Sequence, residues 1–305
     1  MQESTHTLPL TQKSTNSSKK NFLLTASLGG LADLFIASSL HPVDTVKTRL
    51  KANSEVYMPF LKQVRIMYKT EGPFSYFRGL TCSIYGSFIA GASYFYIYEK
   101  LKYTLNKQKI LSQDAAPFVA AFVGSFLSDL LYLPFDVIRT RMQIQPGTYD
   151  YKNILDGFQK VLKSEGPSAL YLGGPVFFAL SAITSSLFFG FYEILNKTLK
   201  PSFPTENNKE VNVQLSVCSS ALAASFSAFL ANPLDVLITR MQSVDTSVQA
   251  RYTILGLMKQ IYQNEGPIGF MKGVTGTMLY YTVFSVVMLP TYEILKAMFN
   301  VDLSE

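Results

Sequence analysis

The feature that most constrains this chain is a motif that occurs three times. Each copy has a proline, an aspartate two residues later and an arginine seven residues after the proline. The copies are offset by 92 and 99 residues, a period that indicates a chain built from repeated structural units. They are Pro42–Arg49, Pro134–Arg141 and Pro233–Arg240.

Three further strings follow each motif in a fixed order, which excludes chance similarity. The first is Glu-Gly-Pro, the second is a three-residue string that ends in glycine, and the third is Tyr-Glu. We therefore expect a polar, disordered tail over residues 1–20 and repeats over 21–110, 111–205 and 206–300. The strings begin at Glu71, Phe77 and Tyr98, at Glu165, Tyr171 and Tyr192, and at Glu265, Met271 and Tyr292.

Long windows almost without charge predict membrane spans. Charged residues make up only 16% of the chain, whereas soluble domains carry roughly 25%. A bilayer-spanning helix needs about 20 largely apolar residues. Six windows meet this need, so the chain is predicted to be a polytopic membrane protein and not a soluble enzyme or a secreted disulfide scaffold. The windows are Asn21–Val43, Gly79–Tyr98, Ala115–Phe135, Gly166–Tyr192, Val211–Leu234 and Gly273–Tyr292.

The polar segment between the two spans of each repeat predicts a short surface helix. Apolar residues recur at helical spacing in Pro59–Tyr68, Ile154–Leu162 and Ile254–Tyr262. The Glu-Gly-Pro string should end each helix, because glycine suits a helix C-terminus and proline cannot continue the helix.

Composition argues against several other functions. The net charge of +6 lacks the basic clusters with aromatic platforms that nucleic-acid binding requires. Two histidines and two cysteines give no metal framework, so neither a metal nor a cofactor is expected. No nucleophile–base pair falls near the spans, so an enzyme is not expected.

The triple motif resembles that of the mitochondrial carrier family over residues 21–300. The resemblance implies an all-α membrane protein of six transmembrane helices in a pseudo-threefold barrel, with three short amphipathic helices on the matrix side. It implies a multi-pass position in the mitochondrial inner membrane with both termini facing the intermembrane space. It also implies a central cavity that opens alternately to either side, a small-molecule substrate, transport by exchange, and cardiolipin as a lipid partner.

The resemblance further implies that the three motifs form a gate on the matrix side. Each proline removes a backbone hydrogen bond and kinks its helix. Each motif also places an acid and, in two copies, a base at membrane depth, where charges are costly unless paired. A glutamine one turn further on braces the gate in the family, and Lys51 takes this place in the first repeat. The other expected gate residues are Pro42, Asp44, Lys47, Pro134, Asp136, Arg139, Gln143, Pro233, Asp235 and Gln242.

One ion pair of this matrix gate is expected to be missing. Ile238 replaces the third base, so Asp136 is expected to have no charged partner. A missing bridge would lower the barrier to opening without abolishing transport. The two expected pairs are Asp44–Arg139 and Asp235–Lys47.

The resemblance places a second gate at the opposite, cytoplasmic end, formed by a tyrosine, an acid and a base three residues after the acid. Asn196 replaces the second base, so Glu99 would face an amide. The expected pairs are Glu193–Lys296 and Glu293–Lys102. The full set is Tyr98, Glu99, Lys102, Tyr192, Glu193, Tyr292, Glu293 and Lys296.

Lipid sites are expected where the second helix of each repeat begins. Free N–H groups and the helix dipole attract phosphate at such positions, and family members bind cardiolipin there. Leu172 replaces the basic residue of the second copy, while simple snorkelling remains the alternative for the other two basic side chains. The expected residues are Arg78, Gly79, Gly173, Lys272 and Gly273.

The expected substrate contacts near the midplane carry no charge. By the resemblance they are Gly86, Leu180 with Ser181, and Tyr280 with Tyr281. Lys and Arg are absent from the predicted spans outside the motifs, which argues against a polyanionic substrate, because nothing would offset the loss of its hydration.

Two acids at membrane depth favour a cationic or zwitterionic substrate instead. Asp33 and Asp129 fall on the cavity-lining face of the first helix in repeats 1 and 2. The alternative is that each acid packs against a neighbouring hydroxyl group.

The segments His41–Leu50 and Ser87–Glu99 are similar to the first repeat of S-adenosylmethionine carriers, whose sulfonium substrate would suit such acids. Leu180 and Ser181 lack the Arg–acid pair of those carriers, so the identity of the substrate stays open.

A different class of function also fits the sequence. A carrier-fold subunit of a larger inner-membrane complex, which no longer transports, would explain Leu172, Asn196 and Ile238 as decay of an unused mechanism. The retained Pro-x-Asp motifs and Tyr-Glu pairs favour an active carrier.

Overall fold

A computed structural model describes residues 34–53, 57–108, 115–144, 149, 151–199, 209–243 and 253–298, with the backbone alone for 209–213 and 288–298. All regular secondary structure in these ranges is helical. The predicted tail over residues 1–20 and the candidate substrate residue Asp33 lie outside them.

Each repeat has the same order of elements: a long helix, a short helix, a single 3-10 turn and a second long helix. The order agrees with the predicted sequence of span, surface helix and span. Repeat 1 contains a helix over residues 34–52, α2 (Phe60–Glu71), η1 (Pro73–Phe77) and α3 (Leu80–Lys107). Repeat 2 contains α4 (Ala115–Gln143), α5 (Ile154–Ser164), η2 (Pro167–Tyr171) and α6 (Gly174–Leu199). Repeat 3 contains α7 (Lys209–Gln242), α9 (Ile254–Glu265), η4 (Pro267–Met271) and α10 (Val274–Met298).

Three stretches of the described chain are both long enough and apolar enough to cross a membrane. They are Ala115–Gln143, Pro167–Leu199 and Gln214–Gln242. The helices α3 and α10 have 28 and 25 residues, which is about 42 and 38 Å at 1.5 Å per residue and exceeds the roughly 30 Å hydrocarbon core. Length therefore supports a span for both helices.

The predicted short helices form with the expected boundaries. The Asn153 side chain accepts a hydrogen bond from the Asp156 N–H at the start of α5, and Thr253 does the same for Gly256 at α9. Gly72 and Gly266 follow α2 and α9 with φ of 77° and 68°, values that glycine adopts without strain.

Each short helix has one buried face and one exposed face. We call the long helix that carries the Pro-x-Asp motif of each repeat its motif helix. Met67, Val161 and Ile261 occupy equivalent positions and are buried against the motif helix of their own repeat. On the opposite face, leucines at the second position of α2, α5 and α9 are 68–77% exposed. An exposed apolar stripe of this kind suits a helix lying at a membrane surface.

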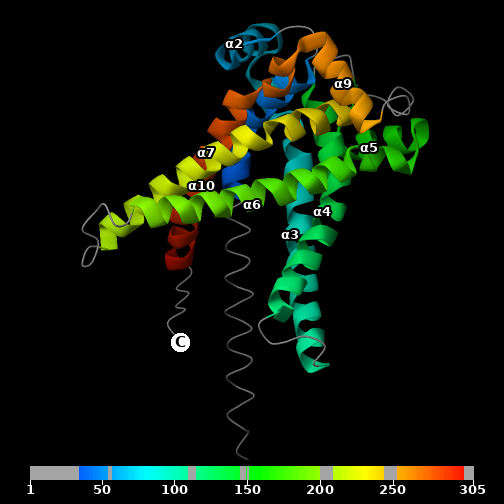
Figure 1. Cartoon of the computed structure of the whole chain (residues 1–305). Coiled ribbons are helices and arrows are strands. Elements are labelled where there is room, and N and C mark those ends of the chain that lie inside the picture. The colour runs from blue at the N-terminus through cyan, green and yellow to red at the C-terminus, as the bar shows by residue number, and fades with distance from the viewer. Residues whose placement is uncertain are drawn as a thin grey trace, which may run out of the picture.

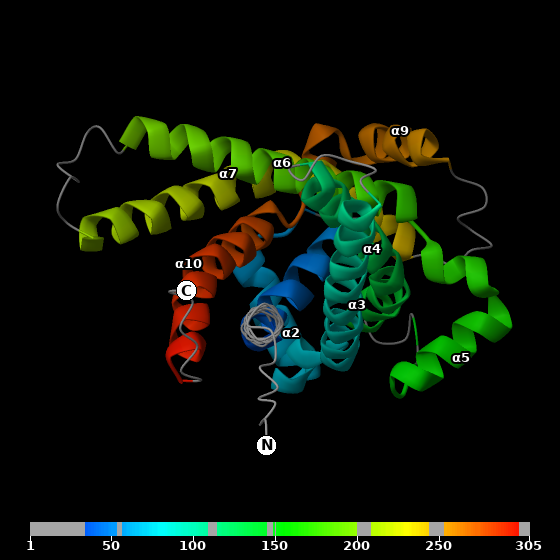
Figure 2. The same cartoon turned by 90° about the horizontal axis from the view of Figure 1, so that it is seen from below.

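The long helices pack in consecutive pairs that diverge from one another. The helix α3 packs on α4, and α7 packs on both α6 and α10. In Figure 1, α3 and α4 run downward together, while α6 and α7 extend together to the left; Figure 2 shows the same divergence from below. The predicted arrangement as a closed pseudo-threefold barrel therefore stays a prediction.

Gly86 allows α3 and α4 to approach closely. A Cβ atom at this position would lie 2.8 Å from Cβ of Phe135 and 3.1 Å from the ring of Tyr132. Phe135 Cβ is fixed to its backbone and cannot move aside. Gly86 is buried between helices and is not among the residues that line the cavity described below, so its predicted contact with a substrate stays a prediction.

We predict that Gly86→Ala lowers thermal stability because the added methyl group forces α3 away from α4. The matched control is Gly91→Ala on the same helix, where an added Cβ meets nothing within 4 Å. Alanine is about 1 kcal/mol more favourable than glycine inside a helix, so the control should be neutral or more stable. Melting temperatures of the purified proteins in detergent test both changes, and a Gly86→Ala protein as stable as the control would contradict the packing argument.

Candidate functional site

Three equivalent hydrogen bonds join the repeats in a closed ring. The last arginine of each motif donates from Nε to the backbone carbonyl of a residue near the end of the next motif helix. Arg49 bonds to Gln143 at 2.7 Å, Arg141 to Gln242 at 3.1 Å and Arg240 to Lys51 at 3.0 Å. Repeat 1 is thus linked to repeat 2, repeat 2 to repeat 3, and repeat 3 to repeat 1.

The same arginines bind the glutamate of the Glu-Gly-Pro string in their own repeat. The Nη2–Oε2 distances are 2.9 Å for Arg49–Glu71, 2.9 Å for Arg141–Glu165 and 2.8 Å for Arg240–Glu265. These pairs tie each short helix to its motif helix. The sequence analysis missed them, although the nearly constant separation of arginine and glutamate in the three repeats was an available signal.

These arginines shift the titration of their partners. Burial raises the pKa of the Glu71 carboxyl, but the hydrogen bond and charge of Arg49 outweigh this effect and leave the pKa below its ordinary value. For Glu265, burial is likewise outweighed by Arg240 and Lys272, and the pKa is again lowered.

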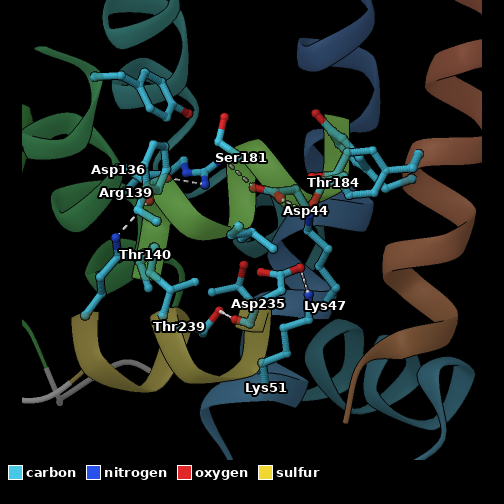
Figure 3. Close-up of a pocket in the computed structure, with 18 of the residues that line it drawn as sticks. Asp44, Lys47, Lys51, Asp136, Arg139, Thr140, Ser181, Thr184, Asp235 and Thr239 are labelled. Carbon is cyan, nitrogen blue, oxygen red and sulfur yellow. Dashed lines mark hydrogen bonds and ion pairs between the residues drawn. The ribbon is translucent and has the colours of Figure 1, made fainter. Parts of the chain in front are cut away.

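Six charged side chains meet where the three motif helices come together, as Figure 3 shows. We call them the charge cluster: Asp44, Lys47, Lys51, Asp136, Arg139 and Asp235. All six line one cavity.

The ion pairs within the charge cluster agree only in part with the predicted pairs. The Arg139 guanidinium lies 3.1 Å from Asp44 Oδ2, so this predicted pair is confirmed. The predicted pair between Asp235 and Lys47 is wrong. Lys47 binds Asp44 of its own helix at 3.0 Å, and Lys51 forms the ion pair with Asp235. Lys51 is four residues further from the proline than Lys47 and therefore reaches the acid from about one turn further along the helix.

Asp136 is not left unpaired, contrary to the prediction. Arg139, one turn away on α4, forms an ion pair with it. The side chain of Gln242 also donates to Asp136 at 2.9 Å. One guanidinium therefore serves two carboxylates, Asp44 and Asp136, which the linear motif could not reveal.

Each predicted bracing residue bonds to the motif aspartate of the preceding repeat, with repeat 3 counted as preceding repeat 1. Gln143 of repeat 2 donates to Asp44 of repeat 1 at 2.9 Å, and Gln242 of repeat 3 donates to Asp136 of repeat 2. Lys51 of repeat 1 binds Asp235 of repeat 3 and completes the series.

A cavity of about 380 Å³ lies against the charge cluster (Figure 3). Four of the predicted substrate contacts line it, and Tyr132, Phe177 and Phe284 add further aromatic rings to its wall. The Lys47 ammonium lies 4.3 Å from the centre of the Tyr280 ring, a cation–π distance. The lining contacts from the prediction are Leu180, Ser181, Tyr280 and Tyr281.

Asp129 stands next to this cavity but does not line it. The Ser181 hydroxyl, which does line the cavity, donates to Asp129 Oδ2 at 3.2 Å. This contact is compatible with both interpretations from the sequence, a substrate contact and an acid that packs against a hydroxyl group. The half-buried carboxylate bonds to a hydroxyl group and can still act on a charged ligand through Ser181.

A second cavity of about 560 Å³ continues from the first toward the far ends of α6, α7 and α10. Thr184, Ser185, Tyr281 and Phe284 line both cavities. The second cavity is otherwise walled by aromatic rings, alanine and serine, so the space changes from charged to largely apolar with distance from the charge cluster.

In the described part of the predicted cytoplasmic gate, two of the side chains have partners within their own helix. Glu193 is exposed and pairs with Lys197 of its own helix at 2.7 Å. The Lys102 ammonium lies 5.3 Å from the centre of the Tyr98 ring. The side chains of Tyr292, Glu293 and Lys296 lie outside the described residues, so the pairs Glu193–Lys296 and Glu293–Lys102 stay predictions.

The predicted lipid-binding residues differ in accessibility. Arg78 is partly exposed and lies 3.5 Å from Glu71. Lys272 is buried, where it binds Glu265 at 2.7 Å and the Asn53 carbonyl at 2.8 Å, so its predicted contact with lipid stays a prediction that these protein contacts do not favour. Gly79, Gly173 and Gly273 take φ of 71–79° just before α3, α6 and α10, a conformation that favours glycine.

Comparison with known proteins finds a family and several relatives. The family model described as mitochondrial carrier protein matches residues 18–109, 113–203 and 209–303. The protein MITOFERRINLIKE 1, chloroplastic, of Arabidopsis thaliana is 29% identical over 276 residues, which are 87% of this chain and 65% of that protein. The mitoferrin of Dictyostelium discoideum is 27% identical over 84% of this chain and 88% of its own. The mitochondrial nicotinamide adenine dinucleotide transporter 1 of Saccharomyces cerevisiae is 27% identical over 88% and 75%.

We predict that acid weakens the links between motif helices and short helices. A carboxyl whose pKa is lowered by folding contributes stability above its unfolded pKa of about 4.3, and this stability is lost as pH falls through the folded value. Glu71→Gln, which leaves the buried Arg49 without its anion, should cost about 3 kcal/mol at pH 7. The loss relative to the parent should shrink near pH 4.

Melting temperatures at pH 7 and pH 4 measure this difference, with the exposed Lys62→Gln as the control on the same helix. A Glu71→Gln deficit that is equally large at both pH values would show that the carboxylate charge is not the source of the stability.

Proposed function

Since the chain belongs to the mitochondrial carrier family, we propose that it transports a small cationic or zwitterionic metabolite across the mitochondrial inner membrane by alternating access. Mitochondrial carriers are multi-pass transporters and not enzymes. The single observation that carries the substrate class is the cavity beside the charge cluster, where three acids and three bases meet uncharged polar and aromatic contacts.

We propose that the three repeats form a six-helix barrel with pseudo-threefold symmetry, the short helices on the matrix side and both termini in the intermembrane space. The cyclic hydrogen bonds of Arg49, Arg141 and Arg240 support a threefold order at the motif end. In this orientation the charge cluster is the matrix gate, and it is held shut by ion pairs.

The opposite end is the cytoplasmic gate of this proposal. Glu193 binds Lys197 within one helix at an exposed position, where such a pair contributes little to stability. When the helix ends approach each other, Glu193 could therefore exchange Lys197 for Lys296 at little cost in free energy. We propose that the carrier opens one gate at a time and exchanges one solute for another.

A substrate with a positive charge fits the acids of the site. Its charge would interact with Asp129 through the Ser181 position and, on the first helix, with Asp33. A zwitterion could also replace ion pairs of the charge cluster while the matrix gate opens. S-adenosylmethionine, which combines a sulfonium with an ammonium and a carboxylate, is the first compound to test.

The names of the relatives do not agree on one substrate. One is a nicotinamide adenine dinucleotide transporter and others are mitoferrins. A dinucleotide carries phosphate groups that need cations free to bind them, whereas Lys47, Lys51 and Arg139 are each paired with an aspartate here. The paired state of these cations favours a substrate that is not a polyanion.

We also propose that cardiolipin binds at the starts of α3, α6 and α10 through backbone N–H groups. Arg78 can assist at the first of these sites because it is partly exposed. The buried Lys272 cannot assist at the third, so backbone amides must bind the phosphate there.

A non-transporting subunit of a larger inner-membrane complex remains the second candidate. Its support was the loss of charged partners at Ile238, Asn196 and Leu172. Arg139 and Lys51 supply cations to all three motif aspartates nonetheless, which weakens the argument from Ile238. Purification as a fixed stoichiometric member of such a complex, with no solute transported, would favour this candidate.

We predict that Asp129→Asn lowers uptake of a cationic substrate into liposomes at least tenfold, because asparagine keeps the size and the bond to Ser181 but removes the charge. A screen of solutes for an increase in melting temperature identifies the compound to use, since a ligand that binds the folded state raises its stability. Yield and melting temperature without ligand should stay near those of the parent.

The matched control is Asp156→Asn on α5, an acid paired with Lys160 at the protein surface. Equal uptake by Asp129→Asn and the parent, or transport of anions only, would show that the acid packs against Ser181 and does not select a cation. Such a result would contradict the proposed class of substrate but not the proposal that the protein transports a solute.

A further inference from the structure

The repeats differ at two positions of the charge cluster, and the differences compensate each other. Three residues after the motif aspartate, repeats 1 and 2 have Lys47 and Arg139 but repeat 3 has Ile238. Seven residues after the aspartate, repeats 2 and 3 have glutamine but repeat 1 has Lys51. Repeat 1 has therefore gained a cation in the same cluster in which repeat 3 lacks one.

We infer that Lys51 is the third cation of the charge cluster and replaces the base that is missing at position 238. Its ammonium forms an ion pair with Asp235, and its side chain is only 1% exposed. With Lys51 the cluster contains three carboxylates and three cations. The inference deepens the proposed function, because it assigns a positioning residue to the proposed matrix gate.

Lys51 occupies a site that is shaped around its side chain. A Cβ added to Gly273 would lie 3.0 Å from Cγ and 3.3 Å from Cε of Lys51, so the absence of a side chain there makes room for the lysine stem. The Lys51 carbonyl also accepts the Arg240 hydrogen bond that joins repeat 3 to repeat 1. Both ends of the residue are thus fixed.

Position 238, by contrast, places an apolar side chain at the same cavity. Ile238 is 4% exposed and belongs to a buried apolar cluster with Val176, Leu237 and Ile261. Its side chain lies 3.1 Å from where a Cβ of Gly173 would be. Position 238 therefore supplies no charge to the cluster, and the third cation comes from another repeat.

Charge balance decides how stable this cluster is. Removing one partner of a buried ion pair leaves an uncompensated charge and is strongly destabilising, while replacing both partners by neutral groups is often tolerated. If Lys51 acts through its charge, its removal harms the protein mainly while Asp235 remains ionised.

The test is a double-mutant cycle of Lys51→Met, Asp235→Asn and the two combined, read as melting temperature in detergent without any solute. Methionine keeps the stem against Gly273 and removes the charge. Each single variant should melt clearly below the parent, and the combined variant should lose much less than the sum of the two single losses. Lys62→Met, an exposed lysine on α2, is the matched control and should melt like the parent.

Each outcome of the cycle decides the inference. Recovery of a folded protein from the combined variant, where Lys51→Met alone cannot be purified, would also support it. Additive losses, or a Lys51→Met protein as stable as the parent, would overturn it and leave Lys51 as a packing residue. Because the measurement needs no transport, a carrier that moves no solute would contradict the proposed function without affecting this result.

Discussion

The structure depends on three arginines that each join two neighbours. Arg49, Arg141 and Arg240 bind the glutamate of their own repeat and the helix end of the next repeat. One side chain thus fixes a short helix to its motif helix and fixes that motif helix to the following one. Removing one partner of a buried ion pair typically costs about 3–5 kcal/mol, so each arginine contributes to folding within a repeat and to assembly between repeats.

The two ends of the molecule are held by interactions of different strength. At the motif end, buried ion pairs and the arginine ring keep the three motif helices together. At the other end, the described acid Glu193 is exposed and paired within its own helix. The pairs α3–α4 and α6–α7 diverge with distance from the motif end, as Figure 1 shows.

The sequence predicted the repeating elements better than the pairing of charges. Periodic apolar residues and the Glu-Gly-Pro strings located α2, α5 and α9, and the motif located Asp44–Arg139. It did not predict that Lys51 reaches Asp235, because motif spacing cannot tell which of two lysines one turn apart faces an acid of another repeat. It also missed the inward direction of Lys272, since a basic residue before a helix is compatible with both lipid and protein contacts.

The three contacts between motif helices are chemically unequal. Arg139–Asp44 joins repeats 1 and 2 by an ion pair, and Lys51–Asp235 joins repeats 3 and 1 in the same way. Repeats 2 and 3 meet in this cluster through the amide of Gln242, which bonds to Asp136 and Thr140, beside the apolar Ile238. Ion pairs therefore join repeat 1 to both of its neighbours, whereas α7 meets α4 in this cluster through uncharged side chains. A solute that passes the cluster would meet a wall of lower polarity on the side between α4 and α7.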